Sequence, residues 1–182
     1  DTTSRQGYHF TELLVRRVRE LDDSRLVTYA TDKPLEDVTM GLFDVIGINQ
    51  YFGWYKKDPA GFAQFLSEFY EYAEKQGVGD KPIVISEFGG AGIFGDVGWE
   101  ETRLFSEEYQ ANILETALNI FSADKKVAGA FVWQFADTRS NVWQFRERAR
   151  GFNNKGIVNE YRKPKLAYRK VKEIFSKPVI RE

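Results

Sequence analysis

The stretch PIVISEFGG, residues 82–90, predicts a buried strand. It is a near-continuous apolar run that ends in Glu-Phe-Gly-Gly, and such a run is typical of a strand buried in a parallel sheet. A carboxylate is almost never fully buried without a partner, so we expect Glu87 to point into the space above the end of this strand. On this stretch alone, a catalytic glutamate and a glutamate in a strand-end salt bridge fit equally well.

Three further runs have the same character: LVTYAT at 26–31, FDVIGIN at 43–49 and AGAFVWQF at 128–135. Helical patterns cover 8–21, 59–76, 107–123 and 165–176. The repeated alternation of strands and helices predicts an α/β fold in which helices cover a parallel sheet, and the lack of a linker predicts one domain. The first helix carries one apolar face, formed by Phe10, Leu13, Leu14, Val18 and Leu21.

The composition excludes several classes of function. The net charge of the 182 residues is −1, which gives no reason to expect a nucleic acid or an anionic membrane as a partner. No apolar run approaches the roughly 20 residues that a membrane-spanning helix needs. With one histidine and no cysteine, we expect no zinc centre, no histidine-based triad and no cofactor. The lack of cysteine also fits a reducing compartment.

Polar and aromatic side chains gather where the predicted strands end. INQYFGWY (48–55) ends the second strand, and FVWQFAD (131–137) ends the fourth. Two long loops, 89–105 and 136–163, also leave strand ends, which is where α/β folds place their sites. For the first motif alone, aromatic core with exposed hydroxyls is the better interpretation, and the tryptophan of the second is either core or a platform for a sugar. The candidates at these ends are Asn49, Tyr51, Tyr55 and Trp133.

Four features together resemble one family closely: Glu87 at a strand end, the N-x-Y-x-G-W-Y run, VWxFAD and the segment N-x-K-G followed by R-K-P-K. The chain is similar to family 2 glycoside hydrolases of the β-glucuronidase type, from LDDSRLVTYA to GIVNEYRKPKLA. The resemblance implies that residues 1–182 form the C-terminal half of a catalytic (β/α)8 TIM barrel, with the four predicted strands as barrel strands 5–8. The first half-barrel and the accessory β domains would then be absent, and Asp1 would begin just after the acid/base glutamate.

The resemblance also implies a role for each candidate residue. Glu87 would be the nucleophile of a retaining mechanism, and Tyr51 would hydrogen-bond it. Asn153 and Lys155 would hold the carboxylate of a uronic acid, which an amide donor and an ammonium suit well. The remaining positions would line the sugar pocket or bind the substrate: Asn49, Tyr55, Trp133, Arg148 and Arg150.

The function implied is hydrolysis of β-D-glucuronides through a covalent glycosyl-enzyme intermediate, by a cytoplasmic enzyme of bacterial rather than lysosomal type. A β-galacturonidase or another family 2 glycosidase is a close alternative. In this family an Asn-Glu pair at the end of the fourth barrel strand carries the acid/base, and no predicted strand here ends in such a pair. We therefore expect the chain alone to be inactive. The partners we expect are a glucuronide substrate, a complementary N-terminal half that carries the acid/base, and further copies in a homo-oligomer. The alternative from another class is a non-catalytic half-barrel that self-associates.

Overall fold

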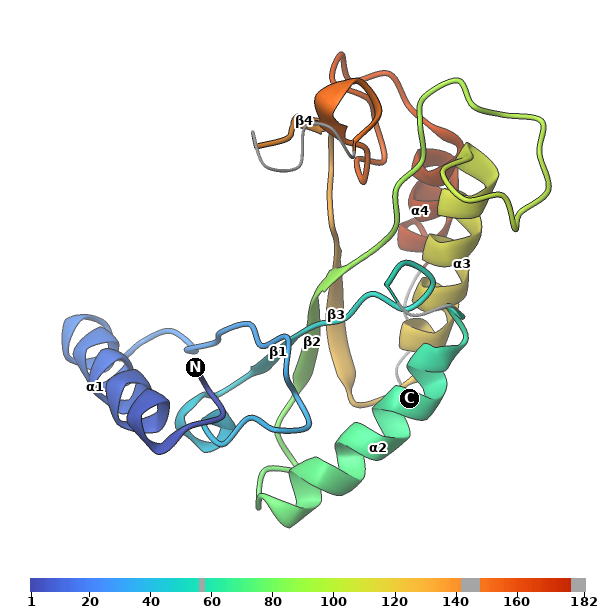
Figure 1. The fold of residues 1–182 in the computed structure, drawn as a ribbon. Coiled ribbons are helices and arrows are strands. Elements are labelled where there is room, and N and C mark those ends of the chain that lie inside the picture. The colour runs from blue at the N-terminus through green and yellow to red at the C-terminus, as the bar shows by residue number, and fades with distance from the viewer. Residues whose placement is uncertain (56–57, 142–147, 178–182) are drawn as a thin grey trace.

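The computed structural model describes residues 1–55, 58–141 and 148–177. At its centre is a parallel three-stranded sheet in the order β1 (Ile46–Asn49), β2 (Ile83–Phe88) and β3 (Val127–Val132) (Figure 1). Ile46 lies opposite Ile83, which in turn pairs with Val127, so the strands start at one level and end at the same edge of the sheet. The parallel α/β sheet predicted from the sequence is therefore confirmed.

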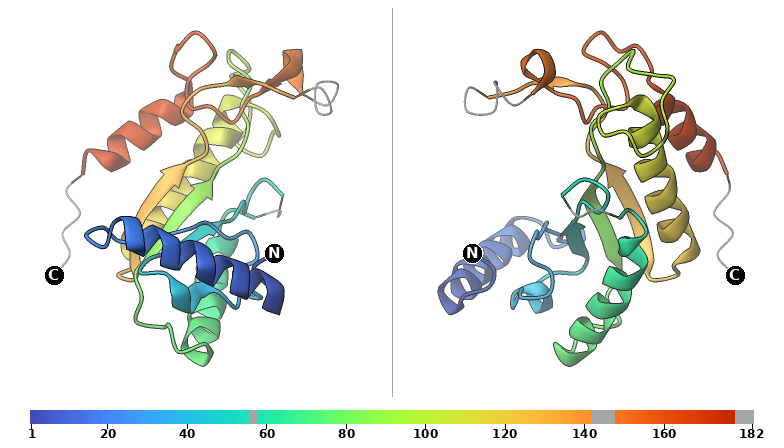
Figure 2. Two further views of the ribbon diagram at one scale, coloured as in Figure 1. Left: turned by 90° about the vertical axis from the view of Figure 1, so that its left-hand side faces the viewer. Right: turned by 45° about the vertical axis from the view of Figure 1, so that its right-hand side comes forward.

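Three helices lie on one side of this sheet: α2 (Gly61–Lys75), α3 (Glu107–Ala123) and α4 (Leu166–Phe175) (Figures 1 and 2). The core lies between the strands and these helices, and Phe62, Phe69 and Phe88 are fully buried in it. Ser106 caps α3, because its hydroxyl accepts a hydrogen bond from the Tyr109 backbone N–H at 3.0 Å. The aromatic core holds the helices against the strands and so fixes the edge at which the strands end.

Helix α1 (Arg5–Leu21) stands apart from the rest of the molecule (Figures 1 and 2). Ser4 caps it, and it packs against the short 3-10 helix η1 (Met40–Leu42). The predicted helix is confirmed, but its apolar face does not contact a core: Phe10 is 64% exposed, and Val15 is the one buried residue of this helix. The exposed apolar side chains of α1 are Phe10, Leu13, Leu14, Val18 and Leu21.

The first predicted strand, 26–31, is not a strand of this sheet. Thr28 and Thr31 form isolated parallel bridges with Val45 and Ile48, so the segment follows β1 but pairs with it only at these points. The contact is nevertheless close, because a Cβ at Gly47 would overlap the carbonyl oxygen of Tyr29. The prediction was right about where this segment runs and wrong about its regularity.

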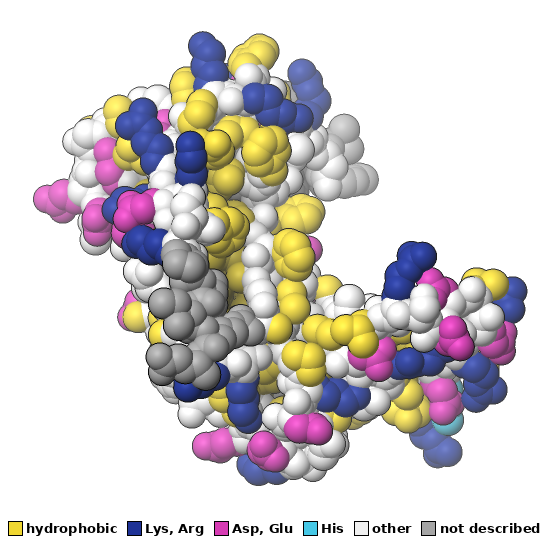
Figure 3. Space-filling view, turned by 180° about the vertical axis from the view of Figure 1, so that it is seen from behind, with side chains coloured by type: hydrophobic (Ala, Val, Ile, Leu, Met, Phe, Trp, Pro, Cys, Tyr) yellow, Lys and Arg dark blue, Asp and Glu magenta, His cyan; other side chains and the backbone are white. Residues whose placement is uncertain are grey.

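The face of the sheet opposite the helices is open. Along β2, Ile83 and Ile85 are buried while Val84 and Ser86 are partly exposed, and Phe131 of β3 is 64% exposed. Figure 3 shows hydrophobic side chains along the middle of the hollowed side of the molecule. The near-continuous apolar runs predict buried strands, but Val84, Ser86 and Phe131 leave part of the face opposite the helices exposed.

The long segment after β3 contains more structure than the predicted loop. Strand β4 (Thr138–Arg139) pairs antiparallel with β5 (Phe152–Asn153), and the 3-10 helix η3 (Ala149–Gly151) leads into β5. Gln134 N–H donates to the carbonyl oxygen of Lys155 at 3.0 Å, which brings residue 155 to the end of β3. The segment that carries Asn153 and Lys155 is thus placed at the edge where the strands end.

Candidate active site

Glu87 is held by a short hydrogen bond from Tyr51. The Tyr51 hydroxyl donates to Glu87 Oε2 at 2.6 Å. Pairing of β1 with β2 creates this contact, since Asn49 lies opposite Glu87 and the chain turns over the sheet just beyond it. Burial and, to a smaller extent, the hydrogen bond to Glu87 raise the pKa of Tyr51. The phenol therefore stays protonated and donates the hydrogen bond. The partner that the structure gives Glu87 is therefore a phenol, not the cation of a strand-end salt bridge.

A hollow of about 460 Å³ opens beside Glu87. This volume lies within the roughly 300–1,000 Å³ of typical small-molecule sites. Asn49 faces it, and its side-chain oxygen accepts a hydrogen bond from the Ser86 hydroxyl at 2.7 Å. The residues that line the hollow are Ala30, Asp32, Asn49, Gln50, Tyr51, Tyr55 and Glu87. Three sequence candidates thus join the nucleophile candidate around one space: Asn49, Tyr51 and Tyr55.

Lys155 is buried in a cage of aromatic rings. Its side chain is only 3% exposed, and its Nζ lies 3.4 Å from the Tyr55 hydroxyl. The ammonium lies 4.8 Å from the ring centre of Trp54, 5.2 Å from that of Tyr55 and 5.7 Å from that of Tyr51. Each ring attracts the cation through its negative face. Because Tyr55 touches Lys155 and lines the hollow with Glu87, the ammonium and the carboxylate belong to one site.

In this cage, Lys155 holds its proton less tightly than an exposed lysine does. Burial, together with the positive charge of Arg148, lowers the pKa of Lys155 to about 8, and the negative charge of Glu87 opposes the shift. The side chain is therefore cationic at neutral pH but loses its charge at mildly alkaline pH. A partly desolvated ammonium of this kind gains strongly from an anionic group brought by a ligand.

Asn153, the last residue of β5, lies two positions before Lys155. Its side-chain oxygen accepts a hydrogen bond from the Lys155 backbone N–H at 3.2 Å, which turns the carboxamide oxygen toward its own segment. The carboxamide nitrogen is then the group that this side chain can offer to a ligand. Asn154, between the two, is buried and donates instead to Asp137 at 3.2 Å.

The two arginine candidates differ in their surroundings. Arg148 lies close enough to Lys155 for its charge to lower the pKa of that lysine. Arg150 is exposed, and its Nη1 lies 3.0 Å from Glu160 Oε1. The structure therefore brings the charge of Arg148 to the site and pairs Arg150 with Glu160. This contact also occupies the glutamate of the Asn159–Glu160 dipeptide, which lies in a turn and not at a strand end.

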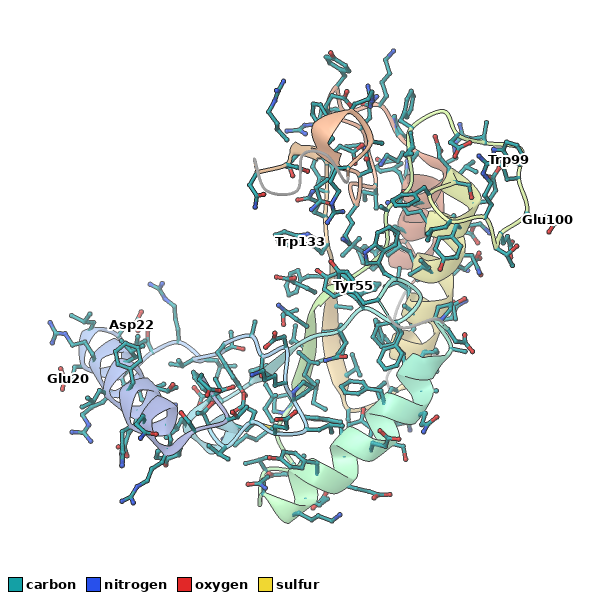
Figure 4. The ribbon with its side chains drawn as sticks, in the orientation of Figure 1. Glu20, Asp22, Tyr55, Trp99, Glu100 and Trp133 are labelled. Atoms are coloured by element: carbon teal, nitrogen blue, oxygen red, sulfur yellow. The ribbon has the colours of Figure 1, made fainter. Side chains whose placement is uncertain are left out.

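Trp133 follows the last residue of β3, and its backbone N–H donates to the Phe88 carbonyl oxygen at 2.8 Å. The side chain is 40% exposed. Figure 4 shows Trp133 and Tyr55 projecting on the open side of the molecule. The interpretation of Trp133 as core is therefore wrong, and its ring offers a surface on the side where the sheet is uncovered.

The candidate list from the sequence missed two features of this site. Trp54, whose ring centre is the nearest of the three to the Lys155 ammonium, is absent from that list, although four aromatic residues within 51–55 were a signal for a cage. The buried ion pair between Asp137 and Lys165, at 2.8 Å, was also missed. The signal there was a carboxylate in FAD and a lysine in RKPK, which no local pattern connects.

Within the described ranges 1–55, 58–141 and 148–177, no three histidine or acidic side chains are grouped so that they could hold a metal ion. In the same part of the chain, no helix has both the length and the apolar character required to cross a membrane. The groups that the described residues bring to this site include a carboxylate, a phenol, an ammonium and amides.

The model of the family described as glycosyl hydrolases family 2, TIM barrel domain, matches residues 3–179. The chain belongs to glycoside hydrolase family 2. This confirms the resemblance seen in the sequence and the TIM-barrel class of the fold, while the assignment to barrel strands 5–8 stays a prediction.

Among curated relatives of this family 2 chain, the β-glucuronidase of Sus scrofa is 34% identical over 171 residues, which cover 89% of this chain and 25% of the relative. That of Streptococcus agalactiae is 29% identical over 176 residues, which cover 92% of this chain and 28% of the relative.

Solved structures give the same family. A β-galacturonidase from Eisenbergiella tayi bound to galacturonate matches with a TM-score of 0.88 and 32% identity, over 96% of this chain and 31% of that one. A β-D-glucuronidase from Dictyoglomus thermophilum matches with a TM-score of 0.84 and 28% identity, over 100% of this chain and 31% of that one. The family 2 chain thus spans between a quarter and a third of the length of these relatives.

Proposed function

We propose that this chain supplies the nucleophile and the sugar-carboxylate clamp of a retaining β-glucuronidase. The observation that carries the proposal is the pair of opposite charges in one site: Glu87, bonded by Tyr51 at 2.6 Å, and the caged ammonium of Lys155. A carboxylate fixed by a phenol suits attack on an anomeric carbon. A desolvated ammonium suits recognition of a carboxylate on the same sugar.

In the first step, Glu87 attacks the anomeric carbon and forms a glycosyl ester while the bond to the aglycone oxygen breaks. That oxygen takes a proton from a second carboxylic acid, which we place in a complementary N-terminal half. In the second step, the same group removes a proton from water, the water attacks the ester, and the uronic acid leaves with retained configuration. Tyr51 donates to Oε2 throughout, which orients the carboxylate and leaves Oε1 for the attack.

The clamp distinguishes a uronic acid from a neutral sugar. Lys155 and the carboxamide nitrogen of Asn153 bind the C6 carboxylate, and Arg148 adds positive charge nearby. A glucoside would leave the Lys155 ammonium desolvated and without a counter-charge, which costs affinity. Arg150, paired with Glu160, has no part in this clamp.

A β-galacturonidase is the second candidate. The Eisenbergiella tayi enzyme of that activity matches this chain at 32% identity and a TM-score of 0.88. Glucuronate and galacturonate carry the same C6 carboxylate, so the clamp serves both. Comparing kcat/KM for nitrophenyl β-glucuronide and nitrophenyl β-galacturonide decides between them.

We propose further that the chain works as part of a larger enzyme. The apolar face of α1 and the open face of the sheet, where Phe131 is 64% exposed, are surfaces that a complementary half-barrel would cover. Self-association of an inactive half-barrel would cover them too. The two possibilities differ in one measurement: hydrolysis of nitrophenyl glucuronide appears on addition of a polypeptide with a strand-end Asn-Glu pair, or it never appears.

The direct test of the nucleophile is covalent trapping. The complete enzyme is incubated with a 2-deoxy-2-fluoro-glucuronide that bears a good leaving group, digested, and examined by mass spectrometry. The sugar mass is expected on the peptide that contains Glu87, bound as an ester. A stable adduct on any other carboxylate would contradict the assignment, and so would turnover of the probe in Glu87→Gln at the rate of the parent.

A further inference from the structure

A buried ion pair joins the segment that carries Lys155 to the rest of the molecule. Lys165 Nζ lies 2.8 Å from Asp137 Oδ1, and neither side chain has exposed surface. Asp137 lies just before β4, and Lys165 immediately precedes α4. Neither residue touches the proposed substrate, so the proposed mechanism leaves this pair without a role.

The Asp137 carboxylate binds the chain on both sides of Lys155. Its Oδ2 accepts a hydrogen bond from Asn154 Nδ2 at 3.2 Å, and its Oδ1 accepts one from the Gly156 backbone N–H at 3.0 Å. Gly156 comes so close that a Cβ there would overlap the backbone nitrogen of Asp137. One side chain thus fixes the residue before Lys155 and the residue after it.

Lys165 extends these contacts to the loop that follows the nucleophile. Its ammonium donates to the Asn154 carbonyl oxygen at 3.0 Å and to the Gly92 carbonyl oxygen at 2.6 Å. Gln110 of α3 makes a second connection of the same kind, since its amide nitrogen donates to the carbonyl oxygens of Gly90 at 2.9 Å and Gly156 at 3.0 Å. The segment around Lys155 and the loop that begins beyond Glu87 are therefore held together by buried polar groups.

A buried ion pair is an inefficient way to stabilise a fold. Removing two charges from water cancels much of their attraction, and apolar side chains of similar volume often stabilise a core at least as well. Burial raises the pKa of Asp137 and lowers that of Lys165, which expresses this cost. Unlike an apolar pair, the ion pair forms directional hydrogen bonds. Each of these bonds fixes one atom of residues 154–156 or of Gly92.

We propose that the Asp137–Lys165 pair is a positioning element that holds the Lys155 ammonium in place relative to Glu87 and so sets the preference for uronic acids over neutral sugars. The inference rests on the proposed function of Glu87 and Lys155. Asp137 acts through Asn154 and Gly156, and displacement of a positioned group by about 1 Å can lower a rate by about 100-fold.

The variant that tests this most directly is Asp137→Asn in the complete enzyme. The Oδ1 of the new carboxamide still accepts both of its hydrogen bonds. Its nitrogen, however, then faces Asn154 Nδ2, so the hydrogen bond between residues 137 and 154 is lost. We expect kcat/KM for nitrophenyl β-glucuronide to fall about tenfold or more, mainly through KM, with less than about a threefold change for nitrophenyl β-glucoside. The double variant Asp137→Asn/Asn154→Asp exchanges donor and acceptor, restores the bond and should recover most of the loss.

A purely structural pair would behave differently, and a double-mutant cycle separates the two roles. In a Lys155→Met background, Asp137→Asn should cause no further loss that is selective for the glucuronide, because the group it positions is gone. The matched control is Lys170→Gln, which breaks the exposed 2.9 Å pair of α4 with Glu115 and should leave the selectivity unchanged. Lys165→Arg keeps the charge and changes the donor geometry, and it replaces Asp137→Asn if thermal unfolding shows that variant to be unfolded.

Equal losses on both substrates, or the same selective loss with Lys155 already removed, would overturn the positioning role. These outcomes are distinct from failure of the proposed function. If Glu87→Gln keeps full activity, the assignment of the site is wrong. If Glu87→Gln abolishes turnover while Asp137→Asn leaves the glucuronide preference intact, only the positioning role is wrong.

Discussion

The carboxylate and the ammonium of this site are brought together by different means. Glu87 lies within strand β2, and the hydrogen bond from Tyr51, at 2.6 Å, completes its orientation. Lys155 lies outside the sheet, and buried polar groups bind the residues on both sides of it. A group on a regular element thus takes its position from the hydrogen-bonded strands, whereas a group on a loop is positioned by side chains that are themselves buried.

The largest loss of activity is expected from Glu87→Gln, which changes the group carried by the strand. The amide cannot form the glycosyl ester, so kcat for nitrophenyl glucuronide should fall by roughly 10⁴-fold or more in the complete enzyme. Steady-state hydrolysis measures this. Glu160→Gln, which alters the glutamate paired with Arg150 at 3.0 Å, is the control and should retain activity. A loss below tenfold in Glu87→Gln would contradict the nucleophile assignment.

The loop-borne half should fail selectively in Lys155→Met. Loss of a charge-assisted contact corresponds to roughly 10- to 150-fold in kcat/KM for the glucuronide. The β-glucoside does not use the ammonium, so its kcat/KM should change much less. Parallel losses on both substrates would show that Lys155 supports the fold and not the recognition of a carboxylate.

Removing the Tyr51 hydroxyl takes away the hydrogen bond that completes the orientation of Glu87. Tyr51→Phe keeps the ring beside Lys155 but cannot donate to Oε2. We expect kcat to fall by roughly 10- to 50-fold for glucuronide and glucoside alike, as expected for loss of a hydrogen bond to a charged group. Tyr161→Phe is a suitable control, since Tyr161 is 76% exposed. An effect confined to the glucuronide would place Tyr51 in the clamp instead.

Alkaline pH should weaken the clamp without a mutation. Since the pKa of Lys155 is lowered to about 8, the ammonium loses its proton as the pH rises through that value, while the substrate carboxylate stays ionised. Between pH 7 and pH 9, the ratio of kcat/KM for glucuronide to that for glucoside should fall by up to about tenfold. The ratio cancels the titration of the shared acid/base. In Lys155→Met it should not vary over this range, and a slope that persists there would assign the effect to another group.

The smallest effect should distinguish the two arginines. Arg148→Met removes a positive charge near Lys155, so the pKa of the lysine should rise. Because the same charge also attracts the substrate carboxylate, its loss should lower kcat/KM for the glucuronide by roughly threefold. Arg150→Met removes the partner of Glu160 and should leave the glucuronide preference unchanged. A larger loss in Arg150→Met would show that residue 150 leaves Glu160 when the substrate binds.

Much of the fold was predictable because its signals are local. The run around Glu87 is nearly continuous in apolar residues, and Ser106 precedes a helical pattern with acidic residues in its first turn, so strand β2 and helix α3 follow from the sequence. Tyr51 and Glu87 could be paired through the family resemblance, and the parallel register of β1 and β2 explains why they meet.

The remainder depends on contacts between segments far apart in the sequence. Nothing local connects Asp137 with Lys165, or Lys155 with Trp54, because each pair meets only after the sheet and the segment around β5 are in place. The residues 26–31 have the composition of a strand, yet pairing limited to isolated bridges leaves them irregular. The exposure of Phe10 was also unpredictable, since a helical period defines an apolar face but not what covers it.

Helix α1 has a consequence for the energetics of assembly. Its apolar side chains remain in water, with Phe10 64% and Leu21 70% exposed, so little burial opposes its local opening. Its stability is therefore linked to whatever covers that face, and rises with the concentration of the covering partner according to mass action. The hydrogen-exchange protection of α1 should therefore rise when a partner covers its apolar face.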